Sequence, residues 1–230
     1  MTGMGSLLAC AATFVGTHLL LSHPLRRPLA SRIGERAFLA VYSLVALATL
    51  AAMVHAYRAA PGDMPLWPVG DGLWAVATLV MLIASILLIG SLVGNPALAG
   101  SPLAPAAASA CGVYAVTRHP MLWSFALWGG AHVLVDPMTR TIILAGAIIG
   151  LSLVGAVMQD RKKAARDPDG WPVWQARTSL LPFAAILTGR ARFGGFGAPA
   201  LLGGPILWLA TTWAHIPLAG WPAGIWRWIV

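Results

Sequence analysis

Long runs of apolar residues recur along the chain and are separated by shorter polar segments. A run of about 17–25 apolar residues is long enough for a helix to cross the hydrocarbon core of a bilayer. Six runs come close to this length: residues 4–22, 38–57, 73–94, 120–135, 141–158 and 199–217. The pattern therefore predicts an all-α fold, a polytopic membrane bundle of about six transmembrane helices, with residues 1–230 in a single domain.

Two connections between the predicted spans do not look like membrane helices. Residues 95–117 are apolar but broken by Pro and Gly, which predicts a loop lying against the helix ends. Residues 159–197 form the longest polar stretch, and we expect a cytoplasmic or interfacial segment there. Within it, residues 179–188 are too short to span the bilayer.

Two pairs of glycines lie in or at the end of the predicted spans, with three residues between partners. These are Gly90/Gly94 and Gly146/Gly150. Small residues at this spacing share one face of a helix and let a neighbouring helix approach closely. Close helix packing is therefore expected at both pairs.

Composition supports a membrane protein over a soluble domain. Charged residues make up 10% of the chain and hydrophobic residues 58%, whereas a soluble domain carries about 25% charged residues. The net charge of +8 does not indicate nucleic-acid binding, because no basic cluster is interleaved with stacking aromatic residues. We therefore expect the lipid bilayer as the partner and no nucleic acid.

The basic residues are distributed unevenly between the two sides of the predicted bundle. Twelve of the 15 Lys and Arg residues fall in the connections on one side, and three fall on the other. Because basic loops stay on the cytoplasmic side, this distribution predicts that both termini lie in the periplasm.

Two histidines lie inside apolar runs without an acidic neighbour. His18 belongs to the first predicted span, and His132 lies near the outer end of the fourth. An ionisable residue at membrane depth is costly and is a functional hypothesis by default. A neutral imidazole there needs partners for one donor and one acceptor, which either a neighbouring helix or a haem iron can supply. The residues alone leave both alternatives open.

A second polar position is the sequence TRHP, residues 117–120, at the predicted cytoplasmic mouth of the fourth span. Arg118 there is either a headgroup anchor or, together with His119, part of a polar catalytic site, and Pro120 suits the first turn of a helix. Motifs for zinc binding, serine hydrolysis and nucleotide binding do not occur in the sequence. These classes of enzyme therefore have no support.

Four segments resemble one family in order and spacing. FVGTHLL, IGERAFLAVYSLVALATL, TRHPMLWSFALWGGAHVL and RTSLLPFAAILTGR resemble the NnrU family of bacterial inner-membrane proteins, over about residues 14–192. That family is homologous to the plant and cyanobacterial zeta-carotene isomerases. The resemblance implies a bacterial inner-membrane location, and either a role in nitrite and nitric oxide metabolism (denitrification) or a carotene-isomerase-like reaction.

The same resemblance implies a cofactor and its ligands. The carotene isomerases are haem b enzymes in which two histidines ligate the iron, and their ligand blocks match GTHLL and GGAHVL. Carried over, the haem ligands here are His18 and His132, and the expected small ligand is an apolar molecule or a nitrogen oxide. The two residues differ in depth within their predicted spans, so His119, which matches His18 better in depth, is the rival ligand.

The RHP element and the downstream sequence DGWPVWQARTSLLPF also resemble the isoprenylcysteine carboxyl methyltransferase superfamily. In that superfamily a similar arrangement helps to hold S-adenosylmethionine, together with an acidic residue on the segment after RHP. The nearest candidate here is Asp160. A membrane methyltransferase and a non-catalytic assembly factor are therefore the alternatives to a haem-dependent isomerase or redox-linked enzyme.

Overall fold

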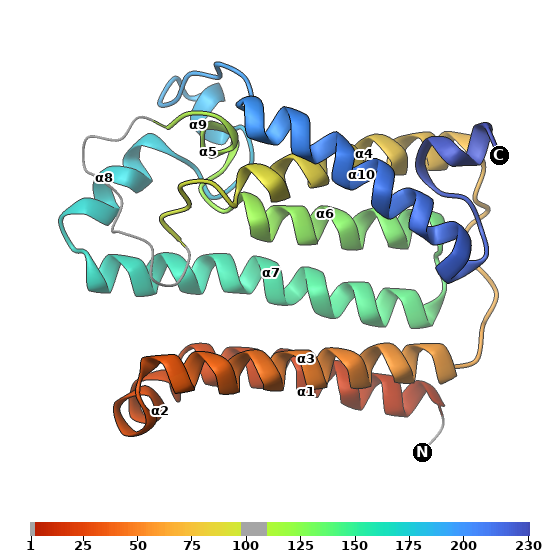
Figure 1. Cartoon of the computed structure of the whole chain (residues 1–230), viewed down its shortest axis with the longest axis horizontal. Coiled ribbons are helices and arrows are strands. Elements are labelled where there is room, and N and C mark those ends of the chain that lie inside the picture. The colour runs from red at the N-terminus through yellow and green to blue at the C-terminus, as the bar shows by residue number, and fades with distance from the viewer. Residues whose placement is uncertain (1–2, 98–109) are drawn as a thin grey trace. The chain divides into compact units, whose positions relative to one another are not determined.

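A computed structural model describes residues 3–97 and 110–230, and all regular secondary structure in these residues is helical. The all-α prediction is confirmed, and each of the six predicted spans corresponds to one helix in Figure 1. These helices are α1 (Gly3–Ser22), α3 (Glu35–Ala59), α4 (Asp71–Gly90), α6 (Pro120–Val135), α7 (Thr139–Arg166) and α10 (Ala198–Ala219). The shorter elements are α2 (Arg26–Ile33), α5 (Val113–Val116), α8 (Gly170–Arg177), α9 (Ala184–Leu187) and the 3₁₀ helix η1 (Gly224–Trp228).

Four helices in the described residues are long and apolar enough to cross a membrane, namely α1, α3, α4 and α7. Helix α6 is apolar but has only 16 residues, slightly below the roughly 17–25 that a span needs. Helix α10 has 22 residues and contains Pro205 and Pro217, each of which removes a backbone hydrogen bond. The chain is therefore a membrane protein, and about six spans are compatible with these helices.

The chain divides into two compact units. The first contains Met1–Val69 and His132–Leu151, and the second contains Gly70–Ala131 and Ser152–Val230. Helices α6 and α7 continue from one unit into the other. The single domain over residues 1–230 stays a prediction, and each unit is described by itself.

In the first unit, α1 lies along α3 (Figure 1). The buried side chains between them include Leu7, Phe14, Phe38 and Met53. Gly3 marks one end of this pair, because a Cβ at Gly3 would lie 3.1 Å from the carbonyl oxygen of Ala59, at the end of α3. The two helices are therefore antiparallel.

The loop between α6 and α7 is hydrogen-bonded to the C-terminal end of α3. Asp136 accepts hydrogen bonds from the Tyr57 hydroxyl at 3.3 Å and from the Thr141 hydroxyl at 2.5 Å. Further along the chain, the indole N–H of Trp67 donates to the Leu134 carbonyl at 3.1 Å. These bonds place the last turn of α6 beside the end of α3.

In the second unit, α4 packs against α10 at very short range. A Cβ at Gly204 would lie 2.7 Å from the Cα of Ile86, and one at Gly203 would lie 2.9 Å from the Cγ2 of Ile89. A Cβ at Gly90 would meet the Val113 side chain at 2.4 Å. Glycine at these positions lets the two backbones approach closely.

The glycine-pair prediction is confirmed only at Gly90. Gly94 lies beyond the end of α4, with a φ of 61°, so it does not share a helix face with Gly90. A Cβ at Gly146 or Gly150 would meet nothing within 4 Å. The search for small residues separated by three others missed Gly203 and Gly204, because these two glycines are adjacent in the sequence.

A cluster of buried apolar side chains lies in the second unit, around the last turn of α4. It joins α4, α5, α8 and α10, and its largest members are Tyr114, Trp171 and Trp174. The Tyr114 hydroxyl donates to the Val93 carbonyl at 2.9 Å, just past the end of α4. Most of the predicted 95–117 loop lies outside the described residues, and its last part forms the single helical turn of α5.

Candidate functional site

Two of the motif segments recognised in the sequence are hydrogen-bonded to each other. The backbone N–H of Arg118 donates to the Ser179 carbonyl at 2.9 Å. The Leu180 carbonyl accepts from the Thr117 hydroxyl and from the Trp123 indole, both at 2.8 Å. The segment after α8 therefore holds the residues that precede α6 in a fixed conformation.

Phe183 completes this contact in an unusual backbone conformation. Its φ of 64° is left-handed, which is rare for a bulky residue. Its backbone N–H donates to the Val116 carbonyl at 2.8 Å. In residues 179–188 only α9, with four residues, is helical, so no spanning helix is present there.

Arg118 and His119 converge on one carboxylate, that of Asp160 on α7. The Arg118 Nε donates to the two carboxylate oxygens at 2.9 and 2.8 Å, and its Nη2 forms a further contact with Oδ2. The His119 Nε2 lies 2.7 Å from Oδ1. The three residues are buried, with exposed fractions of 9%, 2% and 8% for Arg118, His119 and Asp160.

The local sequence explains how two consecutive residues reach one partner. Thr117 is extended, with φ −155° and ψ 148°, and the residue before a proline is also kept out of the helical region. Pro120 then begins α6, where its missing N–H costs nothing. The extended backbone before α6 therefore directs the side chains of Arg118 and His119 toward Asp160 on α7 and not along α6.

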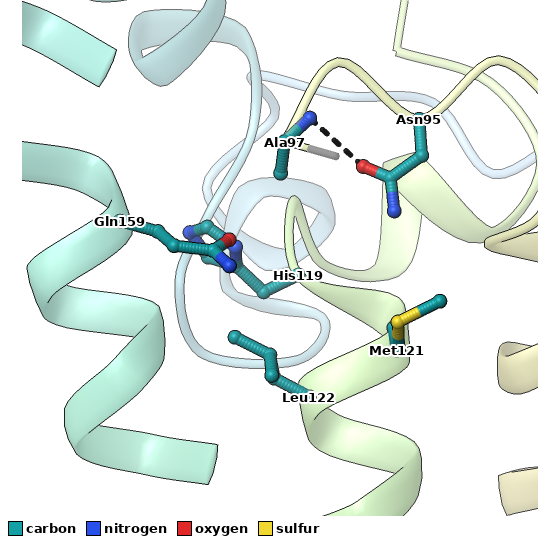
Figure 2. A pocket seen from close by; sticks show the side chains of 6 residues that line it. All are labelled: Asn95, Ala97, His119, Met121, Leu122 and Gln159. Carbon is teal, nitrogen blue, oxygen red and sulfur yellow. Dashed lines mark hydrogen bonds between the residues drawn. The ribbon is translucent and has the colours of Figure 1, made fainter. Parts of the chain in front are cut away.

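One nitrogen of the His119 imidazole, Nδ1, makes no hydrogen bond to the described residues. Since the carboxylate accepts from Nε2, the neutral ring carries its lone pair on Nδ1. Nδ1 is buried and has no hydrogen-bond partner among the described residues. His119 lines a cavity of about 30 Å³ (Figure 2). The other residues around this cavity are Asn95, Ala97, Met121, Leu122 and Gln159.

Lys163, one turn after Asp160 on α7, is a second buried charge that sequence reasoning missed. Its exposed fraction is 5%, and its ammonium group donates to the Pro96 carbonyl. It also lies 6.0 Å from the centre of the Trp171 ring. Lys163 could have been identified in the sequence because it comes three residues after Asp160, which places both side chains on one helix face.

His18 has the tautomer that metal ligation requires. Its Nδ1 donates to the Phe14 carbonyl at 2.8 Å, which leaves the lone pair on Nε2. The ring also contacts Tyr42 edge-on, with centroids 5.7 Å apart. The same backbone bond occurs at His215, to the Thr211 carbonyl at 2.8 Å, so this geometry alone does not identify a ligand.

The structure does not bring His18 and His132 together. His132 lies at the end of the first unit that contains Gly3 and the end of α3, because its carbonyl accepts from the N–H of Asp136 at 2.8 Å. His18 comes 15 residues after Gly3, which is about 22 Å along α1 at 1.5 Å per residue. His132 comes one turn, about 6 Å, before Asp136, so the two histidines differ by about 16 Å along the helix direction. Metal–imidazole bonds are only about 2 Å long. The ligation of one haem iron by His18 and His132 stays a prediction.

His119 does not fit a porphyrin. Its Nε2 is hydrogen-bonded to Asp160, and the cavity that its side chain lines measures only about 30 Å³. His119 and His18 belong to different units, so their pairing stays a prediction.

A larger hollow, open to the surface, lies along α3. It measures about 420 Å³, and all of its lining residues belong to α3. Its lining is mostly apolar: Leu47, Leu50, Ala51, Val54, His55 and Arg58. His55 is the histidine in this lining.

Comparisons with known proteins agree with the motif resemblance. The NnrU protein family matches residues 6–223. The 15-cis-zeta-carotene isomerase of Zea mays chloroplasts is 33% identical over 81 residues, which cover 35% of this chain and 22% of that protein. The Arabidopsis thaliana chloroplast isomerase is 35% identical over 79 residues, 34% of this chain and 22% of that protein.

The chain therefore aligns with only about a fifth of the length of these curated relatives, 22% in each case. No solved structure matches the chain. The family match, in contrast, extends over nearly the whole sequence, from the first turn of α1 to the residue before η1. The protein belongs to the NnrU family.

Proposed function

We propose that this protein is a carotene-isomerase-like membrane enzyme that acts on an apolar, unsaturated substrate taken from the bilayer. Its partial similarity to two 15-cis-zeta-carotene isomerases supports this reaction class. The observation that carries the proposal is the buried Arg118–Asp160–His119 cluster. Ionisable groups in a membrane protein interior are costly to bury, and these three occur in a chain with only 10% charged residues.

Each member of the cluster has a distinct role in the proposed site. Arg118 holds the Asp160 carboxylate in place through two nitrogens. Asp160 in turn fixes the tautomer and orientation of the His119 ring, as a carboxylate does for a catalytic histidine. His119 can then hold or accept a proton at Nδ1. The cluster is therefore suited to proton transfer at one defined atom, through a water-sized molecule that the adjacent cavity of about 30 Å³ admits.

An isomerisation assay tests this proposal. The purified protein in liposomes containing 15-cis-zeta-carotene is expected to change the cis/trans composition of the polyene, measured by chromatography. His119→Gln is expected to lower the rate at least about 100-fold, the usual contribution of a positioned acid or base. Asp169→Asn changes an exposed carboxylate near the same end of α7 and should leave the rate unchanged. A folded wild-type protein without isomerisation would contradict the proposal.

Haem b binding also remains a proposal, with His18 and His132 as the predicted ligands. Protein purified after growth with added haem precursor is expected to show a Soret band that shifts on reduction. The separate substitutions His18→Ala, His132→Ala, His119→Ala and His55→Ala should identify the ligands by loss of the band. Loss of the band with only one of the His18 and His132 substitutions would point to a different second ligand. A colourless wild-type protein would rule out resident haem.

The alternative functions find less support. A methyltransferase would need Arg118 and His119 for S-adenosylmethionine, but Arg118 Nε and Nη2 and His119 Nε2 are all engaged with Asp160. No observation favours an assembly factor or a link to denitrification over the isomerase-like function. The bacterial inner membrane and periplasmic termini stay predictions, which reporter fusions at both ends would check.

A further inference from the structure

The cavity beside His119 has the size and lining of a site for one small polar molecule. We propose that it binds a single water molecule, which donates a hydrogen bond to Nδ1 of His119. The inference deepens the proposed function, because it supplies the buried Asp160–His119 pair with an exchangeable proton. It rests on the geometry of the cavity and on one nitrogen that has no hydrogen-bond partner in residues 3–97 and 110–230.

The unpaired nitrogen is the first observation. The His119 side chain is 1% exposed, and its Nδ1 has no hydrogen-bond partner in the part of the chain that the structure describes. A buried acceptor without a partner costs about 1–3 kcal/mol. Because the ring cannot turn without breaking its 2.7 Å contact with Asp160, a partner has to come to Nδ1.

The volume of the cavity is the second observation. Its approximately 30 Å³ exceeds the roughly 10–15 Å³ that one water requires. It is far below the roughly 300–1,000 Å³ of sites for larger organic ligands. Among polar ligands, the space therefore selects a molecule of the size of water.

The polar lining is the third observation. The Asn95 oxygen accepts the N–H of Ala97 at 2.9 Å, and Figure 2 shows the amide nitrogen of Asn95 on the opposite side from that bond. The bond thus fixes the amide so that its nitrogen remains as a donor. Gln159 adds a second amide to the lining. With His119 Nδ1 as acceptor, the cavity offers three polar groups, within the two to four that a buried water uses.

Solid-state NMR on the full-length protein in lipid bilayers tests the inference. Histidine is labelled with ¹⁵N, magnetisation is transferred from water protons, and the His119 signals are assigned by their absence in His119→Gln. We expect an unprotonated, hydrogen-bonded Nδ1 that receives magnetisation from water. Ala97→Val adds two methyl groups at the cavity and should abolish this transfer. Ala48→Val, on the exposed surface of α3, should leave it intact.

The inference is overturned if wild-type Nδ1 receives no magnetisation from water, or if the transfer persists in a folded Ala97→Val protein. If Ala97→Val does not fold, Leu122→Phe fills the same cavity from α6. The measurement does not use enzymatic activity. Water transfer without isomerisation would therefore refute the proposed function and leave the water site standing. Isomerisation without water transfer would refute the water site and leave the proposed function standing.

Discussion

Replacing Asp160 with asparagine is expected to destabilise the protein by about 3–5 kcal/mol, the cost of leaving a buried charge without its partner. The amide removes the negative charge that faces Arg118 and presents N–H donors to groups that are themselves donors. A loss of this size should lower the thermal unfolding midpoint in detergent by roughly 10 °C. It should also abolish any activity that depends on His119, since the ring loses the carboxylate that orients it.

Two comparisons separate the charge effect from a general effect of substitution. Asp169→Asn makes the same chemical change at an exposed position and should alter the midpoint little. The double variant Arg118→Met/Asp160→Leu replaces the ion pair with apolar groups and should regain most of the stability, while remaining inactive. An Asp160→Asn protein as stable as wild type would show that the cluster is not paired as described.

Replacing Gly204 with valine is expected to separate α10 from α4 and to cost about 3 kcal/mol, the upper part of the range for overpacking. The added Cβ would lie 2.7 Å from the Cα and 3.0 Å from the backbone N of Ile86. These are backbone atoms, which cannot move aside as the end of a flexible side chain can. A clear fall in the thermal midpoint of the detergent-solubilised protein is the expected measurement.

Gly150→Val is the matched control on α7. The position is exposed, and an added Cβ would meet nothing within 4 Å. Because valine is no worse than glycine in a helix interior, the midpoint should stay the same or rise. Equal destabilisation by the two substitutions would contradict the close approach of α4 and α10.

The membrane helices could be predicted from the sequence because hydrophobic length is a local property. The predicted span 120–135 coincides with α6, and 199–217 lies within α10. The prediction of glycine contacts was less successful, because a small residue shows where a helix permits close approach and not whether a partner is there. Gly204 has such a partner in Ile86, and Gly146 has none within 4 Å.

The candidate site was only partly predictable. TRHP pointed to Arg118 and His119, and the methyltransferase resemblance pointed to Asp160. Neither revealed that one carboxylate binds both side chains, because Asp160 is 41 residues from His119 and their contact depends on how α6 and α7 pack. The roles of His18 and His132 stay predictions, and their separation along the first unit could not be settled from motif order.

The sequence by itself determined that this is an all-helical membrane protein of the NnrU type, because apolar run length and short motifs are written in consecutive residues. Only the tertiary structure decided which polar groups meet. It joined Arg118 and His119 to Asp160 and left Nδ1 of His119 without a hydrogen-bond partner among the described residues. The physical reason is that buried charges and hydrogen bonds are satisfied across helices, so their partners follow from packing and not from spacing along the chain.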